Sequence, residues 1–503
     1  MKARAVQMLR AARRRLQPSG LGLQGETTNV SPARRRKRAK RRARERGIAL
    51  VMVMGAIAIL TVMLAEFQDE TSAELAAATA QRDGVQAEYM ARSAVNLSRL
   101  LIASEPSMRK AMAPLFMMMK RTPPQLPLWE FSDRLLGAFN DEDSSGDFSR
   151  TAGVDISQGK NLGMPNGRWE LSIVDEDSKI NMNLGAANEI SHIRLAKEIM
   201  GLIQPMQYDG LFSQQDGTGN FTDRFQTCQA IIDWADVDEQ GFNCDLSQTT
   251  AAASAGIEDN NYALLPRPYR RKNAPFDSLE ELHMVRGVSE DFWATFVDPS
   301  PEDPKKRVVT VWGQGAINVN TANAQTLHAV VCSGALPATP ICVDPNQAAM
   351  FITGVTMARG ISMGAPLFGS PKDFVAALSG QGQLGPLLAG MGMQPVQFQS
   401  PAEFQKQITT ESKMFSVYAV GIKKGYRRET RVKLHAVIDF RNAPQIGQSA
   451  VPGAAGTAGL NGGANPFNPT ASAQGTATGA SPDAIAAANM PSTGGTVVYF
   501  RVE

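Results

Sequence analysis

The first strong pattern along this chain is a change from uniformly apolar to amphipathic helix. Residues 48–65 form an apolar run of 18 residues without a charged side chain. At a rise of about 1.5 Å per residue, this run would span about 27 Å as a helix, close to the thickness of a bilayer's hydrocarbon core. Residues 66–103 contain no proline, and their apolar positions recur at roughly helical spacing. We therefore predict one helix from residue 48 to about 103, membrane-spanning at its start, which stops at Pro106.

Alternating apolar and polar positions, typical of strands, appear on both sides of a long helical region. Half-buried strands are predicted at 168–174, 415–422, 427–440 and 496–502, with a hairpin turn at 423–426. Residues 185–400 are mostly helical, with helices predicted at 186–200, 227–234, 278–285 and 324–331. A strand at 168–174 is not stable alone, so it needs partners around 415–440. The pattern predicts a helical domain inserted into an α+β domain.

The segment before the last strand has a different composition. Residues 445–495 are rich in Gly, Ala, Pro, Ser, Thr and Asn and lack the large apolar side chains that would offset ordering entropy, so we expect them to be disordered. The predicted segments are 1–47 (basic leader), 48–105 (long helix), 106–184 (loop and first strand), 185–400 (inserted helical domain), 401–444 (β-hairpin), 445–495 (linker) and 496–503 (final strand).

Charge is distributed unevenly along the chain. Residues 1–47 hold 16 of the 51 Lys and Arg but 2 of the 48 Asp and Glu, a net charge of +14, which leaves −11 on the rest. Because flanking Lys and Arg stay cytoplasmic, we expect the chain after residue 65 to lie across the membrane. A disordered or nucleic-acid-binding arm and an ordinary secretory signal are the alternatives. The acidic body argues against a general nucleic-acid binder.

The junction between the basic leader and the apolar run resembles a known processing signal. Arg46-Gly47 followed by an apolar helix is similar to the class III signals of type IV pilins and type II secretion pseudopilins. In that family a prepilin peptidase cuts after the glycine, and the new N-terminus, here Ile48, is methylated. The fifth residue after the cut is usually glutamate. Met52 departs from this pattern, as one large member type commonly does.

That member type is the K-type minor pseudopilin, general secretion pathway protein K. The segments that resemble it, between Arg46 and about Phe440, are 89–94, 174–183, 232–236, 276–287 and 317–322. The resemblance implies a type IV pilin-like fold, in which a long N-terminal helix packs on an antiparallel sheet, with an inserted domain of SAM-like or helix-hairpin-helix type.

The same resemblance implies a structural protein rather than an enzyme. It would cap the tip of the type II secretion pseudopilus and act in protein export across the outer membrane. It would cross the inner membrane once, with a cytoplasmic N-terminus and a periplasmic body. Its partners would be the I- and J-type minor pseudopilins, the major pseudopilin and the prepilin peptidase.

The four cysteines fall into two local pairs, Cys228 with Cys244 and Cys332 with Cys342. In an oxidising compartment beyond the membrane, we expect a disulfide within each pair. Closing a loop of about 15 residues stabilises by roughly 3 kcal/mol on the chain-entropy model. Buried free thiols are the alternative. Zinc is disfavoured because the chain has no CxxC and only 4 His.

Carboxylates gather at the end of an apolar helix and again after a small-residue loop. Hard oxygen ligands of this kind suit Ca²⁺, which takes six to eight of them. The K-type head is associated with calcium, so the resemblance points the same way. We predict a calcium site that uses some of Asp233, Asp236, Asp238, Glu258 and Asp259. The alternative is a solvated acidic loop with helix-capping aspartates.

Two other functions compete with the structural one. Residues 285–288 and 317–322 also resemble helix-hairpin-helix segments of DNA-uptake proteins, which bind phosphates through a Gly-rich hairpin. Acidic residues beside that hairpin favour protein interaction, so we expect no nucleic-acid partner: Glu280, Glu281, Glu290 and Asp291. A membrane-anchored exoenzyme is disfavoured because the four His are scattered and no nucleophile motif occurs, so no catalytic residue is predicted.

Overall fold

The computed structural model describes residues 32–118, 122–137, 139–140, 161, 164–216, 219–245, 254–257, 260–362, 364–382, 385–425, 428–444 and 492–503. The chain divides into two compact units, Met1–Thr79 and Ala80–Glu503. The leader before residue 32 and most of the segment predicted to be disordered, 445–491, lie outside the described residues.

One long helix, α2 (Pro32–Met118), begins in the first unit and continues into the second. Between Ile48 and Ala65 every side chain is exposed and none is charged; Leu50, for example, is 63% exposed. A helix that is apolar all round normally lies inside a protein core or in a bilayer. Because no part of the 18-residue apolar window is buried, this helix is a candidate membrane anchor by length and composition.

The predicted stop at Pro106 is wrong: α2 runs on to Met118, with two prolines inside it. A proline removes one helical hydrogen bond, but the side chains on either side of this one compensate. The Glu105 carboxylate is almost fully buried, pairs with Arg109 one turn later at 2.8 Å, and accepts a bond from the Leu126 amide at 2.9 Å. The ion pair within the helix and the bond to Leu126 stabilise α2 on both sides of the proline, so the predicted segment boundary at 105 falls inside α2.

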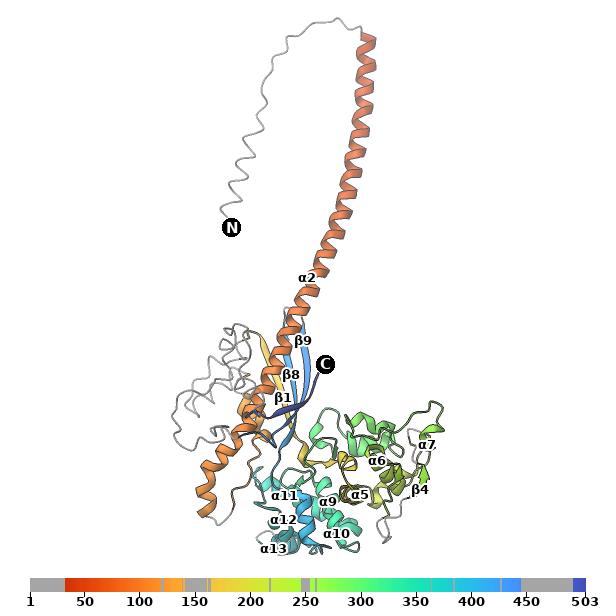
Figure 1. Ribbon diagram of the computed structural model, residues 1–503. Coiled ribbons are helices and arrows are strands. Elements are labelled where there is room, and N and C mark those ends of the chain that lie inside the picture. Colours follow the sequence, from red (N-terminus) through yellow and green to blue (C-terminus); the bar gives the residue numbers. More distant parts are fainter. Residues whose placement is uncertain are drawn as a thin grey trace, which may run out of the picture. The chain divides into compact units, whose positions relative to one another are not determined.

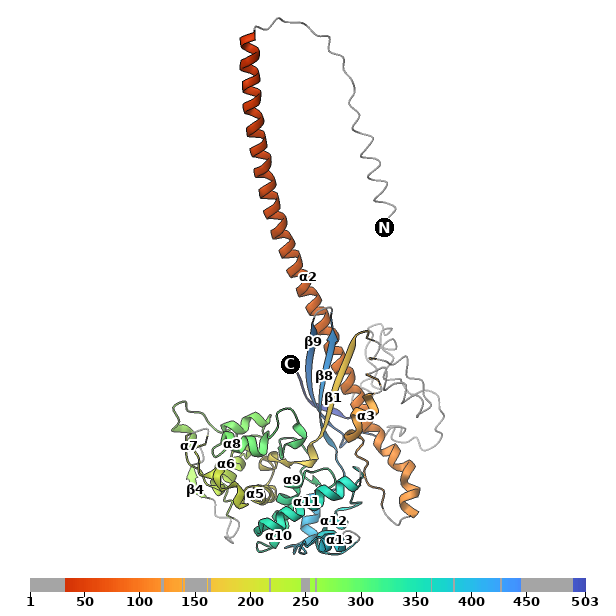
Figure 2. The ribbon, with the colours of Figure 1, turned by 180° about the vertical axis from the view of Figure 1, so that it is seen from behind.

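The second unit contains a four-stranded antiparallel sheet in the order β1-β8-β9-β10 (Figures 1 and 2). Its strands are β1 (Gly167–Asp175), β8 (Met414–Lys424), β9 (Glu429–Asp439) and β10 (Thr496–Val502). In β1 and β8 the register runs from Gly167 opposite Lys423 to Asp175 opposite Phe415. Two neighbouring strands are therefore separated in sequence by the whole region from 176 to 413. The α+β class and the long helix with an antiparallel sheet are confirmed.

Helix α2 covers one face of this sheet through a core of small residues. Met90, Ala91 and Ala94 are fully buried there, against strand residues such as Ile173 and Phe415. In Figure 1 the helix lies in front of the strands, and in Figure 2, seen from behind, the strands lie in front of it. Alanines on the helix allow a close approach to the sheet.

A second hydrophobic core lies in the inserted region, the stretch of sequence that separates β1 from β8. This region is built from short elements. Besides α2, the α-helices of the described residues are α3 (Ser132–Gly137), which precedes β1, and α5 (Glu189–Ile203), α6 (Arg224–Ala235), α7 (Asn260–Ala263), α8 (Glu290–Phe292), α9 (Ala324–Gly334), α10 (Pro340–Val343), α11 (Pro345–Ile361), α12 (Pro371–Leu378), α13 (Gly385–Gly390) and α14 (Pro401–Gln407), which follow it. Short strands pair as β2 (Ile180–Asn181) with β5 (Val309–Thr310), β3 (Gln240–Gly241) with β4 (Ser254–Ile257), and β6 (Ile317–Asn318) with β7 (Ile408–Thr409).

Short 3₁₀ and π helices complete the fold: the 3₁₀ helices η1 (Leu128–Phe131), η3 (Glu176–Ser178), η4 (Met182–Ala186), η5 (Met206–Phe212), η6 (Leu279–Met284) and η8 (Pro304–Lys306), and the π-helix η7 (Trp293–Val297). The helix predicted at 278–285 is present as the 3₁₀ helix η6, two residues shorter than predicted. The Ser278 side chain makes no capping bond there.

A buried network of carboxylates joins the end of β1 to the inserted region. Asp175 accepts hydrogen bonds from the hydroxyl groups of Thr321 and Ser412, and Asp177 accepts one from the Lys413 amide at 2.7 Å. The two carboxyl groups are buried where the chain leaves β1 for the inserted region and where it returns to β8. Burial, together with the charge of Asp177, raises the pKa of Asp175 to about 8.

Candidate functional site: the membrane anchor and an acidic pocket

The predicted processing junction lies inside the first unit. Gly47 and Ile48 are both within α2, and Ile48 is 56% exposed. Met52, the residue found where the family usually has glutamate, is also exposed. The first unit thus presents an apolar helix directly after the predicted cleavage point, with no carboxylate in it before Glu66.

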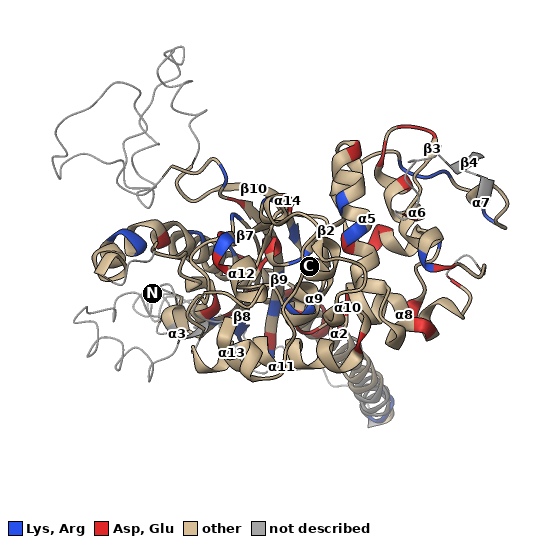
Figure 3. Ribbon diagram, turned by 90° about the horizontal axis from the view of Figure 1, so that it is seen from below, with Lys and Arg blue, Asp and Glu red and all other residues tan. Residues whose placement is uncertain are grey.

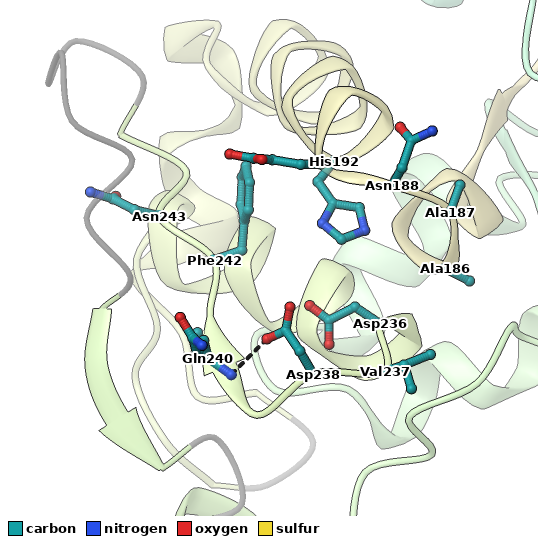
Figure 4. A pocket seen from close by; sticks show the side chains of 12 residues that line it. Ala186, Ala187, Asn188, His192, Asp236, Val237, Asp238, Gln240, Phe242 and Asn243 are labelled. Atoms are coloured by element: carbon teal, nitrogen blue, oxygen red, sulfur yellow. Dashed lines mark hydrogen bonds between the residues drawn. The ribbon is translucent and has the colours of Figure 1, made fainter.

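The acidic pocket is formed between the start of α5 and the connection from α6 to β3. It has a volume of about 470 Å³, and its walls include Asn188, Glu189 and His192 from α5 and its cap, and Asp236, Val237, Asp238, Gln240, Gly241, Phe242 and Asn243 from the connection. Asp236 and Asp238 lie side by side on one wall with His192 above them (Figure 4). Figure 3 shows acidic residues, in red, on the chain near β3.

The three described aspartates of the predicted calcium set have different surroundings. Asp233, near the end of α6, is buried and accepts a hydrogen bond from the Phe242 amide at 2.8 Å. Burial raises the pKa of Asp233 to about 7, and burial together with the Asp238 charge raises the pKa of Asp236 to about 6. Asp238 accepts a bond from the Gln240 amide at 2.7 Å. In the pocket itself, Asp236 is therefore the carboxyl group whose pKa is raised, with Asp238 beside it.

Arg271 is a cation that bonds directly to this group. Its guanidinium donates to the Asp233 carbonyl oxygen at 2.8 Å, to the Asp236 carboxylate at 3.3 Å and to the Asp238 carbonyl oxygen at 2.7 Å. It therefore fixes the backbone of the acidic connection as well as pairing with one carboxylate. Nothing in the local sequence pattern indicated this residue, which follows the connection by more than thirty positions.

The structure brings two of the five predicted ligands, Asp236 and Asp238, into one pocket. Asp233 turns away to the Phe242 amide, and Glu258 and Asp259 lie outside the described residues. Within the described ranges, no group of three or more His, Cys, Asp or Glu side chains is close enough to hold a metal ion. Two carboxylates with nearby amide oxygens suit the chemistry of Ca²⁺ but fall short of its six to eight ligands. Water or residues of 246–259 would have to supply the others.

Other residues of the pocket were missed by sequence reasoning. Asn188 caps α5 by accepting from the Ser191 amide at 3.0 Å, and the His192 ring meets Phe242 edge-on at 5.8 Å. Burial lowers the pKa of His192. An Asn that precedes an amphipathic run is a readable helix-start signal, but its position beside a loop some fifty residues later is not.

Two disulfides lie in the inserted region. Cys228 and Cys244 join α6 to the chain after β3, with Cα atoms 6.2 Å apart, and Cys332 and Cys342 join α9 to α10 at 5.6 Å. The first closes the base of the acidic connection. Each disulfide links residues of one local pair.

The hairpin that resembles a DNA-binding segment already holds an anion from the protein itself. Gly287 has a φ of 88°, and its amide donates to the Asp216 carboxylate at 2.8 Å. A Cβ at this glycine would lie 2.2 Å from the Thr227 hydroxyl oxygen, so the hairpin is also packed closely against α6. The amide that would bind a phosphate is therefore occupied.

An exposed apolar helix that continues onto an antiparallel sheet defines a helix-anchored α+β protein. Residues 203–297, which contain α6, the acidic connection and the first disulfide, match the model of the family described as "Type II secretion system (T2SS), protein K". This match confirms the resemblance to K-type minor pseudopilins over that stretch, and with it the predicted class of function, a minor pseudopilin of type II secretion.

Among solved structures, the chain is similar to one in the crystal structure of the GspK-GspI-GspJ complex from the type 2 secretion system of enterotoxigenic Escherichia coli. The sequence identity is 15%, the match covers 55% of this chain and 76% of that chain, and the TM-score is 0.34. The comparison with curated proteins found no match.

Proposed function

We propose that this protein caps the tip of a type II secretion pseudopilus and is anchored in the inner membrane by α2. Its N-terminus would be cytoplasmic, its leader would be removed after Gly47 by a prepilin peptidase, and the second unit would lie in the periplasm. The observation that carries the proposal is the combination of the protein K match at 203–297 with an exposed, uncharged helix preceded by a basic leader. The proposed role is structural and needs no catalytic group.

The topology follows from charge. The +14 leader is held on the cytoplasmic side, so the 18 apolar residues after it enter the bilayer and carry the acidic remainder across. A bilayer would stabilise this exposed uncharged helix, because in water every one of its large apolar side chains would be hydrated.

The tip position follows from Met52 and from the inserted region. A carboxylate in the apolar segment is costly unless it is partnered, so in the family it marks a contact between subunits. Met52 cannot make that contact, and a subunit without it suits the start of a stack. The region inserted between β1 and β8 adds a large second core beside the sheet. A head of this size would obstruct a further subunit above it.

The expected partners are the I- and J-type minor pseudopilins, with the major pseudopilin beneath them. The part of α2 that precedes the sheet core carries exposed apolar residues, including Phe67 and Leu75. In pseudopilins the subunits associate through such helices, so this stretch is the proposed contact.

Calcium binding at the acidic pocket is part of the proposal. Asp236 and Asp238 would be its carboxylate ligands, with Glu258 and Asp259 as the candidates for the remaining protein oxygens. A bound cation would balance the Asp236 carboxylate, whose pKa is raised by burial and by the Asp238 charge. The pair of adjacent aspartates in one pocket supports the site.

Calcium is tested on the full-length protein in detergent. A ligand that binds only the native state, at a concentration 100 times its Kd, stabilises it by about 2.7 kcal/mol. The unfolding temperature should therefore be higher in calcium than in EGTA. The double variant Asp236→Asn, Asp238→Asn should lose the shift. Glu403→Gln, in an exposed ion pair on α14, should keep it. If the wild-type protein unfolds at the same temperature in calcium and in EGTA, the proposed calcium site is wrong.

The function itself is tested in the organism that encodes the chain. Deletion of the gene should leave exported proteins in the periplasm, and the wild-type gene should restore their release into the medium. Normal export by the deletion strain would contradict the proposed function.

A DNA-binding role in a pilus or DNA-uptake system is the alternative. The occupied amide of Gly287 offers it no support, because the Asp216 carboxylate would have to leave first.

A further inference from the structure

A small apolar cavity lies among the later helices of the inserted region and shares no lining residue with the acidic pocket. Its volume is about 80 Å³, and residues of α9, α11, α12 and α13 line it. These helices lie together in both views of the ribbon (Figures 1 and 2). The apolar side chains of its wall include Leu327, Phe351, Phe374 and Leu388. Such a wall suits an apolar chain better than water, which needs polar partners.

Arg359, in the last turn of α11, differs from the rest of this wall. It has the one polar side chain among the described residues that line the cavity. Its guanidinium donates from Nη2 to the Val319 carbonyl oxygen at 3.1 Å. The Nε atom is buried and has no hydrogen-bond partner in the described part of the chain. Burial lowers the pKa of Arg359 to about 10, so the side chain still carries its charge at neutral pH.

This buried cation bonds to no carboxylate of the described residues. The Glu130 charge acts on Arg359 from a distance, but the Glu130 carboxylate is in an ion pair with Lys305 at 3.2 Å. A buried charge costs free energy unless it is paired and hydrogen-bonded. A guanidinium presents a fork of donors that matches the shape of a carboxylate. The cavity therefore combines apolar walls with a cation that lacks an anionic partner.

We propose that the cavity binds an aliphatic carboxylic acid, whose carboxylate pairs with Arg359 and whose alkyl chain fills the apolar space. Charge complementarity selects the head group, because a carboxylate oxygen can accept the Nε hydrogen that has no partner. The wall selects the tail, because an alkyl chain brings no polar group into it. A water needs roughly 10–15 Å³ of such a volume, so about 80 Å³ holds about six water-sized groups, enough for a short alkyl chain.

The C-terminus of a polypeptide carries the same charge but suits the cavity less well. Its last peptide group would bring an amide N–H and a carbonyl oxygen in beside the carboxylate. Among the described lining residues, Arg359 alone has a polar side chain to bond them. A buried amide without a hydrogen bond costs free energy, so the free acid is the favoured occupant. The inference goes beyond the proposed function and does not depend on the place of the protein in a pseudopilus.

The probe is radiolabelled hexanoate, and its binding to the full-length protein in lipid nanodiscs is measured by equilibrium dialysis, with empty nanodiscs as the blank. Hexanoate should bind saturably, and at least about tenfold more tightly than three unlabelled competitors, as expected for a hydrogen bond to a charged group. Hexanol lacks the charge, acetate lacks the tail, and N-acetylleucine adds a peptide group. No saturable binding of hexanoate, or equal or tighter binding of any competitor, would overturn the proposal.

Three variants test the roles of the cation and the cavity. Arg359→Met should weaken hexanoate binding about 10- to 100-fold and leave hexanol binding unchanged, whereas a merely misfolded wall would weaken both. Lys372→Met, at an exposed position on α12, removes a charge outside the cavity and should bind like the wild type. A Cβ at Gly354 would lie 3.1 Å from the end of the flexible Met391 side chain, so Gly354→Leu should fill the cavity and abolish binding with Arg359 intact. Equal hexanoate affinities of Arg359→Met and Lys372→Met, or wild-type affinity of Gly354→Leu, would refute the site.

Discussion

The closest approach between α2 and the sheet gives the sharpest stability prediction. A Cβ added at Gly421 on β8 would lie 1.8 Å from the Ala87 carbonyl oxygen and 2.8 Å from the Ala91 amide nitrogen. Both neighbours are backbone atoms of a helix, so no side-chain rotation can relieve the clash. In Gly421→Ala the helix must move away from the strand by more than 1 Å, because ordinary contact begins at about 3.4 Å.

That displacement would loosen the core beneath the helix. A radial gap of 0.5–1 Å already loses about a quarter to a half of the dispersion attraction across a contact, and overpacking a core costs about 1–3 kcal/mol or more. We expect Gly421→Ala to lower the free energy of unfolding by about 3 kcal/mol, at the upper end of that range, because the residues that must move are fully buried. Urea unfolding of the full-length protein in detergent, followed by near-ultraviolet circular dichroism, measures this loss.

The matched control lies on the same helix, one turn before Ala87. A Cβ at Gly84 would meet nothing within 4 Å. Gly84→Ala should therefore stabilise α2 by up to about 1 kcal/mol, since alanine is the better helix former. If the two alanine variants unfold at the same urea concentration, the close packing of α2 on β8 is not a feature of the folded protein.

The remaining predictions concern protonation, disulfides and processing. Burial raises the pKa of Asp175 to about 8 from an ordinary 3.8, so the folded protein binds this proton more tightly than the unfolded chain does. The contribution of Asp175 to the free energy of unfolding therefore falls as pH rises from about 4 to 8. Asp175→Asn should therefore flatten the dependence of unfolding free energy on pH between 5 and 9, and an unchanged slope would contradict the assignment. Non-reducing peptide mapping should find both disulfides, and Cys→Ser replacement of either pair should cost about 3 kcal/mol; four free thiols would refute this. Membrane-extracted protein should begin at Ile48, and Gly47→Val should keep the leader attached; a mature wild-type protein that starts at residue 1 would exclude processing.

The main elements of the sheet and the anchor could be predicted because their signals are local. The anchor is visible as an uncharged run of 18 residues, because that is the length needed to span a bilayer. The strands β1, β8, β9 and β10 are visible as alternating apolar and polar residues, because side chains of a strand repeat every two residues. The pairing of β1 with β8 was predictable only because a lone strand is unstable.

What could not be predicted depends on contacts between distant residues. The continuation of α2 past Pro106 rests on the bond between Glu105 and the Leu126 amide. Beside the acidic pocket, the Phe242 amide fixes the direction of the Asp233 carboxylate, and the Arg271 guanidinium donates to the Asp233 carbonyl oxygen. No periodicity or motif encodes these contacts, because each becomes visible only once the chain is folded.

The position of the protein in the assembly is the central claim, and labelling assembled pseudopili with immunogold against the second unit tests it most directly. We expect one cluster of gold at a single end of each filament, since Met52 and the inserted region suit the first subunit of the stack. Gold distributed along the shaft would contradict it.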